Sequence, residues 1–248
     1  MTPSLTGMDR SLQERIDVLR GLMSDQRSSV HAALAELAAR RRNAKWPGYR
    51  NIGDFASGAY ESEHVSPYTK GASNVASPVF VLLQDWVSED FLTAGDNENL
   101  KTLGREPSLP TNKNLEALIR DHFGLDLSEV YATNLFPFVK PAGMSANIPA
   151  KDLRRAAQEF ALPQIKVVSP RLVIALGVKT FNALRYVCGL RSCRNLTEAL
   201  ESSFVYSGAT VWCQAHTGAL GRANRNRGGV DRVSVDWRRM ADWYRNSA

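Results

Sequence analysis

Residues Val79-Phe80-Val81-Leu82-Leu83-Gln84-Asp85-Trp86 form the stretch of sequence that decides the fold. Its first five residues are apolar without a break and include β-branched and aromatic types, a pattern typical of a strand buried on both faces. Gln84 and Asp85 then follow abruptly. Because ligands of open α/β sheets bind just beyond the carboxyl ends of the strands, the stretch predicts a functional site at these two residues.

Three further stretches repeat this arrangement of an apolar run that ends at a polar residue or a glycine. They cover residues 130–133, 172–176 and 210–215, and they lead to Asn134, Gly177 and His216. Helical patterns separate all four stretches, which predicts parallel strands joined by right-handed crossovers. We therefore expect Asp85, Asn134 and His216 to meet at one edge of one sheet.

The predicted fold is three-layer α/β/α, with a central, mainly parallel four-stranded sheet and an N-terminal helical extension. Apolar residues at helical spacing predict helices over residues 112–123, 151–168, 180–188 and 236–244. Residues 10–42 are predicted as two helices broken near Asp25-Gln26, residues 46–77 as an irregular connection, and residues 88–110 as a long polar loop. Residues 1–70 form the expected extension with its connecting segment, and residues 71–248 the α/β domain.

Composition favours a soluble, cytoplasmic protein, and we expect it to be a monomer. The net charge is +6 and 44% of the residues are hydrophobic, with no apolar run long enough for a membrane span and no signal-peptide pattern. A basic protein is compatible with a polyanionic partner. The cysteines Cys188, Cys193 and Cys213 lack metal-ligand spacing, which indicates reduced thiols and predicts neither a metal site nor a cofactor.

Four segments in the same order resemble motifs of the uracil-DNA glycosylase superfamily. The segment ending in Gln84-Asp85 is similar to that superfamily's water-activating motif, and residues 130–141 are similar to the strand whose Asn reads uracil. Residues 170–177 resemble its third strand, and residues 216–220 its loop that enters the DNA minor groove. Three cysteines cannot supply the four-cysteine iron–sulfur cluster of some members.

The resemblance implies hydrolysis of the N-glycosidic bond of uracil, or of a related deaminated base, in DNA. Asp85 would stabilise the cationic sugar and position a water, and His216 would donate a hydrogen bond to the departing base. Asn134 would bind the Watson–Crick edge of the base and Gln84 would orient it. Trp86 and Phe91 are the aromatic residues offered for stacking on the base.

The same resemblance implies a set of DNA contacts. Leu220 would fill the gap left by the extruded base, Ser108 would touch a phosphate, and Arg222 and Arg225 would form part of a flexible basic patch. Each has a plainer alternative, in which Leu220 is a core residue and the arginines form a solvated loop. The cluster Arg40-Arg41-Arg42 with Lys45 is likewise either a solvated helix end or a phosphate-contacting flank.

Two other classes of function fit the same residues. A non-catalytic nucleic-acid-binding protein would keep the fold and the basic loop without base release. A hydrolase of a free nucleotide or another small substrate would show little salt dependence of substrate affinity.

Overall fold

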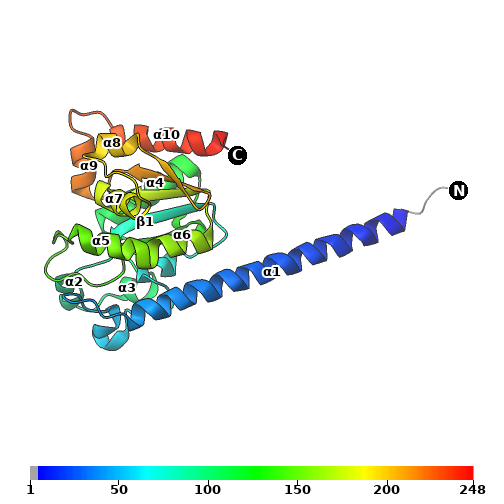
Figure 1. The fold of residues 1–248 in the computed structure, drawn as a ribbon, viewed down its shortest axis with the longest axis horizontal. Helices are drawn as coiled ribbons and strands as arrows, with labels where there is room; N and C mark the ends of the chain where they lie inside the picture. The colour runs from blue at the N-terminus through cyan, green and yellow to red at the C-terminus, as the bar shows by residue number, and fades with distance from the viewer. Residues whose placement is uncertain (1–4, 248) are drawn as a thin grey trace.

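A computed structural model describes the backbone of residues 5–247 and the side chains of residues 24–247. The fold is three-layer α/β/α, as predicted, with helices on both faces of a mostly parallel sheet (Figure 1). The sheet has five strands rather than four, in the order β2-β1-β3-β5-β4. The strands are β1 (Val79–Asp85), β2 (Tyr131–Phe136), β3 (Leu172–Leu176), β4 (Phe204–Tyr206) and β5 (Ala209–Gln214).

The unpredicted strand is β4, which pairs antiparallel with β5 at one edge of the sheet. It has three residues, and its side chains are exposed or half-buried, so it leaves no apolar run in the sequence. Ser207 and Gly208 connect it to β5 with φ values of 50° and 85°. Positive φ at both central residues is the geometry of a tight two-residue hairpin, which explains how so short a strand is paired.

Side chains of β1 alternate between two hydrophobic clusters, one on each face of the sheet. Phe80 and Leu82 belong to the first core cluster, while Val79, Val81 and Leu83 belong to the second. All five are at most 3% exposed. Because both faces are covered, the strand is apolar at every position instead of at every other one.

The first core cluster lies beneath α1 (Leu5–Asn43), α5 (Ala150–Ala156), α6 (Leu162–Val168) and α7 (Val178–Val187). The second lies beneath α4 (Pro110–Phe123) and α10 (Arg232–Asn246). Gly124, with φ of 67°, ends α4 in the left-handed conformation, as its position in the sequence predicts. In α10, Trp237 is fully buried and Trp243 packs against the second cluster, which confirms both as packing residues.

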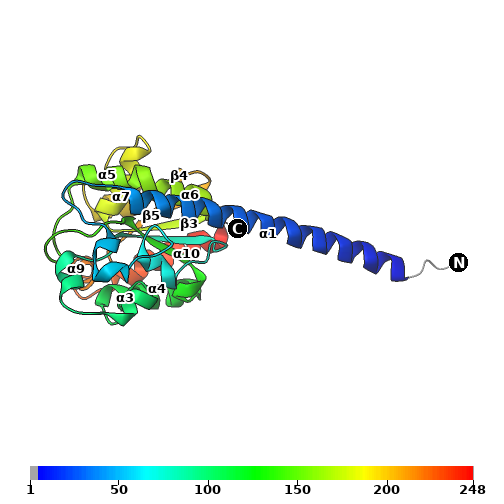
Figure 2. The ribbon, with the colours of Figure 1, turned by 90° about the horizontal axis from the view of Figure 1, so that it is seen from below.

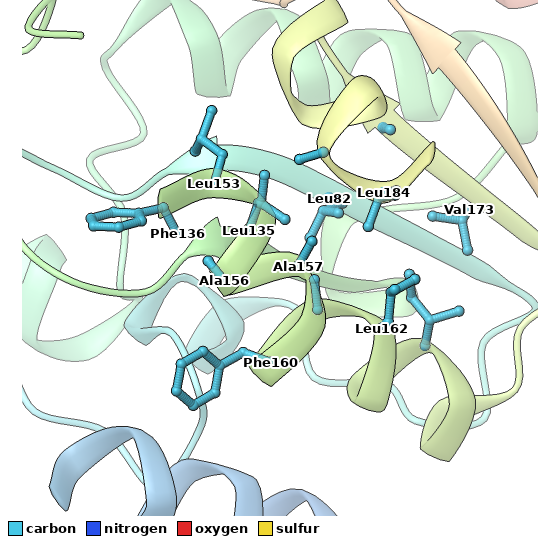
Figure 3. Close-up of a cluster of buried hydrophobic side chains, with 14 of the residues drawn as sticks. Leu82, Leu135, Phe136, Leu153, Ala156, Ala157, Phe160, Leu162, Val173 and Leu184 are labelled. Atoms are coloured by element: carbon cyan, nitrogen blue, oxygen red, sulfur yellow. The ribbon is translucent and has the colours of Figure 1, made fainter. Parts of the chain in front are cut away.

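The predicted helix over residues 151–168 contains a π-helical segment, η5 (Ala157–Ala161), between α5 and α6. Pro163 lacks the N–H that would bond to the carbonyl of Glu159 in a regular α-helix. That carbonyl instead accepts a hydrogen bond from the guanidinium of Arg40 in α1. Ala156, Ala157 and Phe160 point from this run into the first core cluster (Figure 3).

Helix α1 is one continuous helix of 39 residues, so the predicted break near Asp25-Gln26 is wrong. Its N-terminal part extends away from the body of the molecule (Figures 1 and 2). Leu34, Leu37 and Ala38, near its C-terminal end, are buried in the first core cluster. This end therefore anchors the helix on the domain.

Arg41 is the central residue of the basic cluster at the end of α1, and it is neither a solvated helix end nor a phosphate-contacting flank. Arg41 is fully buried, and its guanidinium forms an ion pair with Glu61 and donates to the carbonyls of Val65 and His64. Arg42 donates to the carbonyl of Ser62. These bonds fasten the connecting segment to α1.

Segments on either side of residue 70 share the same core. Trp46 lies in the first cluster, and Ile52, Phe55, Tyr60 and Tyr68 lie in the second. The irregular connection carries the short 3₁₀ turns η1 (Ile52–Asp54), η2 (Ala56–Gly58) and η3 (Pro67–Gly71). The predicted polar loop 88–110 contains the short helices α2 (Glu89–Thr93) and α3 (Glu98–Thr102). The other short elements are η4 (Leu127–Glu129), α8 (Leu196–Leu200) and α9 (Ala219–Arg225).

Replacement of Arg41 by Met is expected to lower the free energy of unfolding by about 3 kcal/mol, because it leaves Glu61 and two carbonyls without their buried partner. Urea unfolding measures the change. Arg238→Met, at an exposed position of α10, removes the same charge and is expected to stay within about 0.5 kcal/mol of the wild type. Equal unfolding midpoints for the two variants would contradict the anchoring role of Arg41.

Candidate active site

Asp85 and His216 line one cavity at the carboxyl edge of the sheet. Asp85 is the last residue of β1, and His216 follows β5 by two positions. The cavity, called here the Asp85 cavity, has a volume of about 370 Å³, within the range typical of ligand sites. Its other lining residues include Tyr68, Trp86, Val87, Asn112, Met144 and Leu220.

The carboxylate of Asp85 is held at both oxygens. Lys140 Nζ lies 2.6 Å from Oδ2, and Gln84 Nε2 donates to Oδ1 at 3.0 Å. The side chains of Asp85 and Lys140 are only 13% and 4% exposed, so the ion pair is largely withdrawn from water. Lys140 also donates to the carbonyl of Met144, which ties the loop after β2 to the site.

Lys140 was not predicted as a site residue. It lies within the segment that resembles the uracil-reading strand, where it is the single cation. A single cation within that segment could have indicated a site residue. The partner could not be read from the sequence, because the ion pair joins the end of β1 to a loop more than fifty residues later in the chain.

His216 is held as the tautomer that carries its proton on Nε2. The backbone N–H of Gly218 donates to Nδ1 at 3.0 Å, so Nδ1 must be an acceptor. Burial lowers the pKa of His216 below its ordinary value; the charge of Asp85 opposes this effect and the charge of Lys140 adds to it. A neutral imidazole of this tautomer offers one hydrogen-bond donor, Nε2–H.

The glycines of the 216–221 loop permit close packing rather than flexibility. A Cβ atom on Gly221 would lie 2.1 Å from the carbonyl oxygen of His216, and one on Gly218 would lie 2.9 Å from its Nδ1. Thr217 is fully buried, and its hydroxyl donates to the carbonyl of Thr111 at 2.9 Å. Asn114 Nδ2 in turn donates to the carbonyl of Thr217 at 2.7 Å. The loop is thereby fixed to the start of α4.

Asn134, predicted to read the base, is fully buried. Its Nδ2 donates to the backbone carbonyl of Asp85 at 2.7 Å, and its Oδ1 accepts from the hydroxyl of Ser66 at 2.6 Å. Asn134 therefore braces the end of β1. Neither Asn134 nor Gln84 is among the described residues that line the Asp85 cavity.

Asn112, in the first turn of α4, is an amide that does line the cavity. Its Oδ1 accepts from the Tyr68 hydroxyl at 3.0 Å, and its Nδ2 donates to the carbonyl of Glu106 at 2.7 Å. An amide NH₂ has two donors and an amide oxygen has two lone pairs, so one donor and one acceptor remain. Sequence reasoning missed Asn112 because it opens a helix and does not follow a strand.

Two aromatic residues line the cavity, Trp86 as predicted and Tyr68, which was not. Trp86 Nε1 donates to the carbonyl of Gly104 at 2.7 Å, which fixes the indole. Tyr68 lies in η3, before β1, in a segment with no periodic signal. Phe91, the other predicted stacking residue, lies in α2 and packs against the second core cluster.

The residues predicted to contact DNA differ in whether other side chains of the protein already bind them. Leu220 is 78% exposed at the cavity, so it is not a core residue. Arg225 forms a two-point ion pair with Asp236 at 2.7 and 2.9 Å. Arg222 donates to Asn114 at 2.9 Å and has Asp231 at 3.9 Å. The hydroxyl of Ser108, near the cavity residue Glu106, donates to the carboxylate of that residue at 2.7 Å.

Residues 24–247 hold no cluster of three or more His, Cys, Asp or Glu side chains arranged to bind a metal ion. Among the helices that the structure describes, none combines the length and the apolar character needed to cross a membrane.

Because the pKa of His216 is lowered in the folded protein, the free energy of unfolding should depend on pH. The unfolded chain binds a proton near the ordinary histidine pKa of 6.5, while folded His216 resists it, so stability is lost as the pH falls through this value. His216→Gln keeps an acceptor for Gly218 and should show a shallower loss between pH 7 and pH 5 (the pH range over which histidine ordinarily titrates). Urea unfolding at a series of pH values tests this, and parallel curves for both proteins would contradict it.

Comparison with known proteins adds no family to this geometry. Neither the family models nor the curated proteins that were searched match the chain. A function must therefore be argued from the Asp85 cavity and from the residues that surround it.

Proposed function

We propose that this protein is a cytoplasmic, monomeric DNA glycosylase that hydrolyses the N-glycosidic bond of uracil or a related deaminated base. The observation that carries the proposal is the pairing of an ion-paired carboxylate, Asp85, with a neutral imidazole, His216, in the lining of one cavity. The resemblance of the four sequence segments agrees with it.

These two groups suit the charges that develop when a C1′–N bond breaks. The sugar becomes cationic and the base leaves as an anion. The Asp85 carboxylate stabilises the cation and accepts a hydrogen bond from the attacking water. His216 Nε2–H donates to the carbonyl oxygen of the departing base, where the negative charge accumulates. Neither step requires a covalent intermediate, so the enzyme would be monofunctional.

Base recognition falls to residues other than those first predicted. Asn112 lines the cavity and retains one donor and one acceptor, a combination that suits the edge of uracil. Tyr68 and Trp86 supply the aromatic walls. Leu220, exposed at the mouth, is placed to occupy the gap that an extruded base leaves in DNA.

Lys140 gives weight to the second candidate, a non-catalytic nucleic-acid-binding protein. An ammonium 2.6 Å from the Asp85 carboxylate offsets part of the negative charge that would stabilise a cationic sugar. We assign Lys140 to positioning, because its ammonium and the Gln84 amide hold the two oxygens of the Asp85 carboxylate. Under the second candidate the same pair serves stability alone.

Asp85→Asn and His216→Ala should each reduce uracil release by roughly 10² to 10⁴-fold, because each removes one group that stabilises transition-state charge. Release is measured by alkaline cleavage of single-stranded and duplex uracil-containing oligonucleotides. Binding to the same oligonucleotides should persist in both variants.

Arg238→Met is the matched control, since it lies in α10 and should release uracil at the wild-type rate. Wild-type binding without any strand cleavage would support the non-catalytic candidate. Full activity in both site variants would overturn the assigned roles.

Lys140→Met should lower kcat for uracil release more than it raises KM, because the Asp85 carboxylate loses the ammonium that orients it. A role in stability alone would leave kcat and KM of the folded protein unchanged. Lys140→Arg, which keeps a cation, should restore kcat toward the wild-type value.

A further inference from the structure

We propose that a second cavity, between the N-terminal halves of α5 and α7, binds a nucleotide of single-stranded DNA that flanks the target base. This inference rests on the proposed function. The cavity, called here the Lys179 cavity, has a volume of about 400 Å³. Its charged lining residues are Arg154 and Lys179, and its apolar wall includes Ile148 and Leu153. Cations around an apolar wall suit a phosphate joined to a base.

One loop joins the two cavities. Met144 and Ser145 line the Asp85 cavity, and Asn147 and Ile148 line the Lys179 cavity. Two residues of extended chain span only about 7 Å, so the cavities are close neighbours. Because α5 and α7 follow β2 and β3, the Lys179 cavity opens at the same edge of the sheet as Asp85. A strand leaving the Asp85 cavity can cross the loop into it.

The two cations of this cavity have neutral partners, unlike Arg225 of the predicted basic loop. Lys179 Nζ is bonded to the neutral amide of Asn147 at 2.5 Å. The Arg154 guanidinium lies 3.8 Å from the ring centroid of Tyr186. In contrast, Arg225 is paired with the carboxylate of Asp236. Cations with neutral partners keep their charge available for phosphate.

Tyr186 adds a stacking surface beside the cavity. Tyr186 lies in α7 and is 53% exposed. An exposed aromatic ring next to an arginine is the combination on which proteins stack unpaired bases. Duplex DNA would not offer a free base to this ring, so the surface favours single strands.

The test measures binding of a uracil-free single-stranded oligonucleotide of about 16 nucleotides by fluorescence anisotropy, over a series of salt concentrations. Lys179→Ala should reduce the magnitude of the negative slope of log affinity against log salt by about 0.7, the value for one lost phosphate contact on a single strand. Tyr186→Ala should weaken binding with the slope unchanged. Lys166→Ala, an exposed position in α6 away from the cavity, removes the same charge and should leave slope and affinity unchanged.

The outcomes separate this inference from the proposed function. At saturating concentrations of a uracil-containing oligonucleotide, Lys179→Ala should release uracil at the wild-type rate, since Lys179 lies outside the Asp85 cavity and binds only the flanking nucleotide. If the wild-type protein releases uracil but the Lys179→Ala and Lys166→Ala variants give identical salt slopes, the inference is overturned and the proposed function is not. A reduced slope without uracil release by the wild type would support the inference and count against the glycosylase.

Discussion

Burial of β1 on both faces is the constraint on which the rest of the structure depends. A strand covered by helices on both sides can carry a polar side chain only where another protein group hydrogen-bonds to it, because no water is present to solvate it. Its polar residues are confined to the carboxyl end, where Gln84 and Asp85 stand. Lys140 and Asn134 then serve that end, one through the carboxylate and one through the backbone carbonyl of Asp85. The location of the site thus follows from the burial of β1 by helices on both faces of the sheet.

The buried ion pair of Asp85 and Lys140 lies beside His216, whose pKa is lowered by burial. The ion pair of Asp85 and Lys140 carries no net charge, so its burial is tolerable. A third charge on His216 would have no partner, and burial accordingly lowers the pKa of this residue. The result is a polarised pair of groups in the cavity, with an acceptor at Asp85 and a donor at His216. Such a pair is matched to a reaction that separates charge.

The sequence predicts the parts of this structure that follow from local pattern. The four apolar runs, the stop of α4 at Gly124 and the positions of Asp85 and His216 were all predicted. Asn134 was misplaced because β2 continues to Phe136, so Asn134 pairs with Leu83 inside the sheet instead of following the strand. Tyr68 and Asn112 reach the cavity, and Lys140 reaches the Asp85 carboxylate, through tertiary packing that no spacing in the chain predicts.

Net charge is a poor guide to where this protein would hold a polyanion, and the reason lies in the pairing of individual cations. The arginines of α9 are the obvious basic group in the sequence, yet Arg225 is committed to Asp236, and Arg222 to Asn114 and Asp231. These bonds fix α9 and so hold Leu220 at the mouth of the Asp85 cavity. An arginine that is ion-paired to a carboxylate, as Arg225 is, is less available to bind a phosphate. Lys179, which bonds to a neutral amide and has no carboxylate partner among the described residues, keeps its charge available for phosphate.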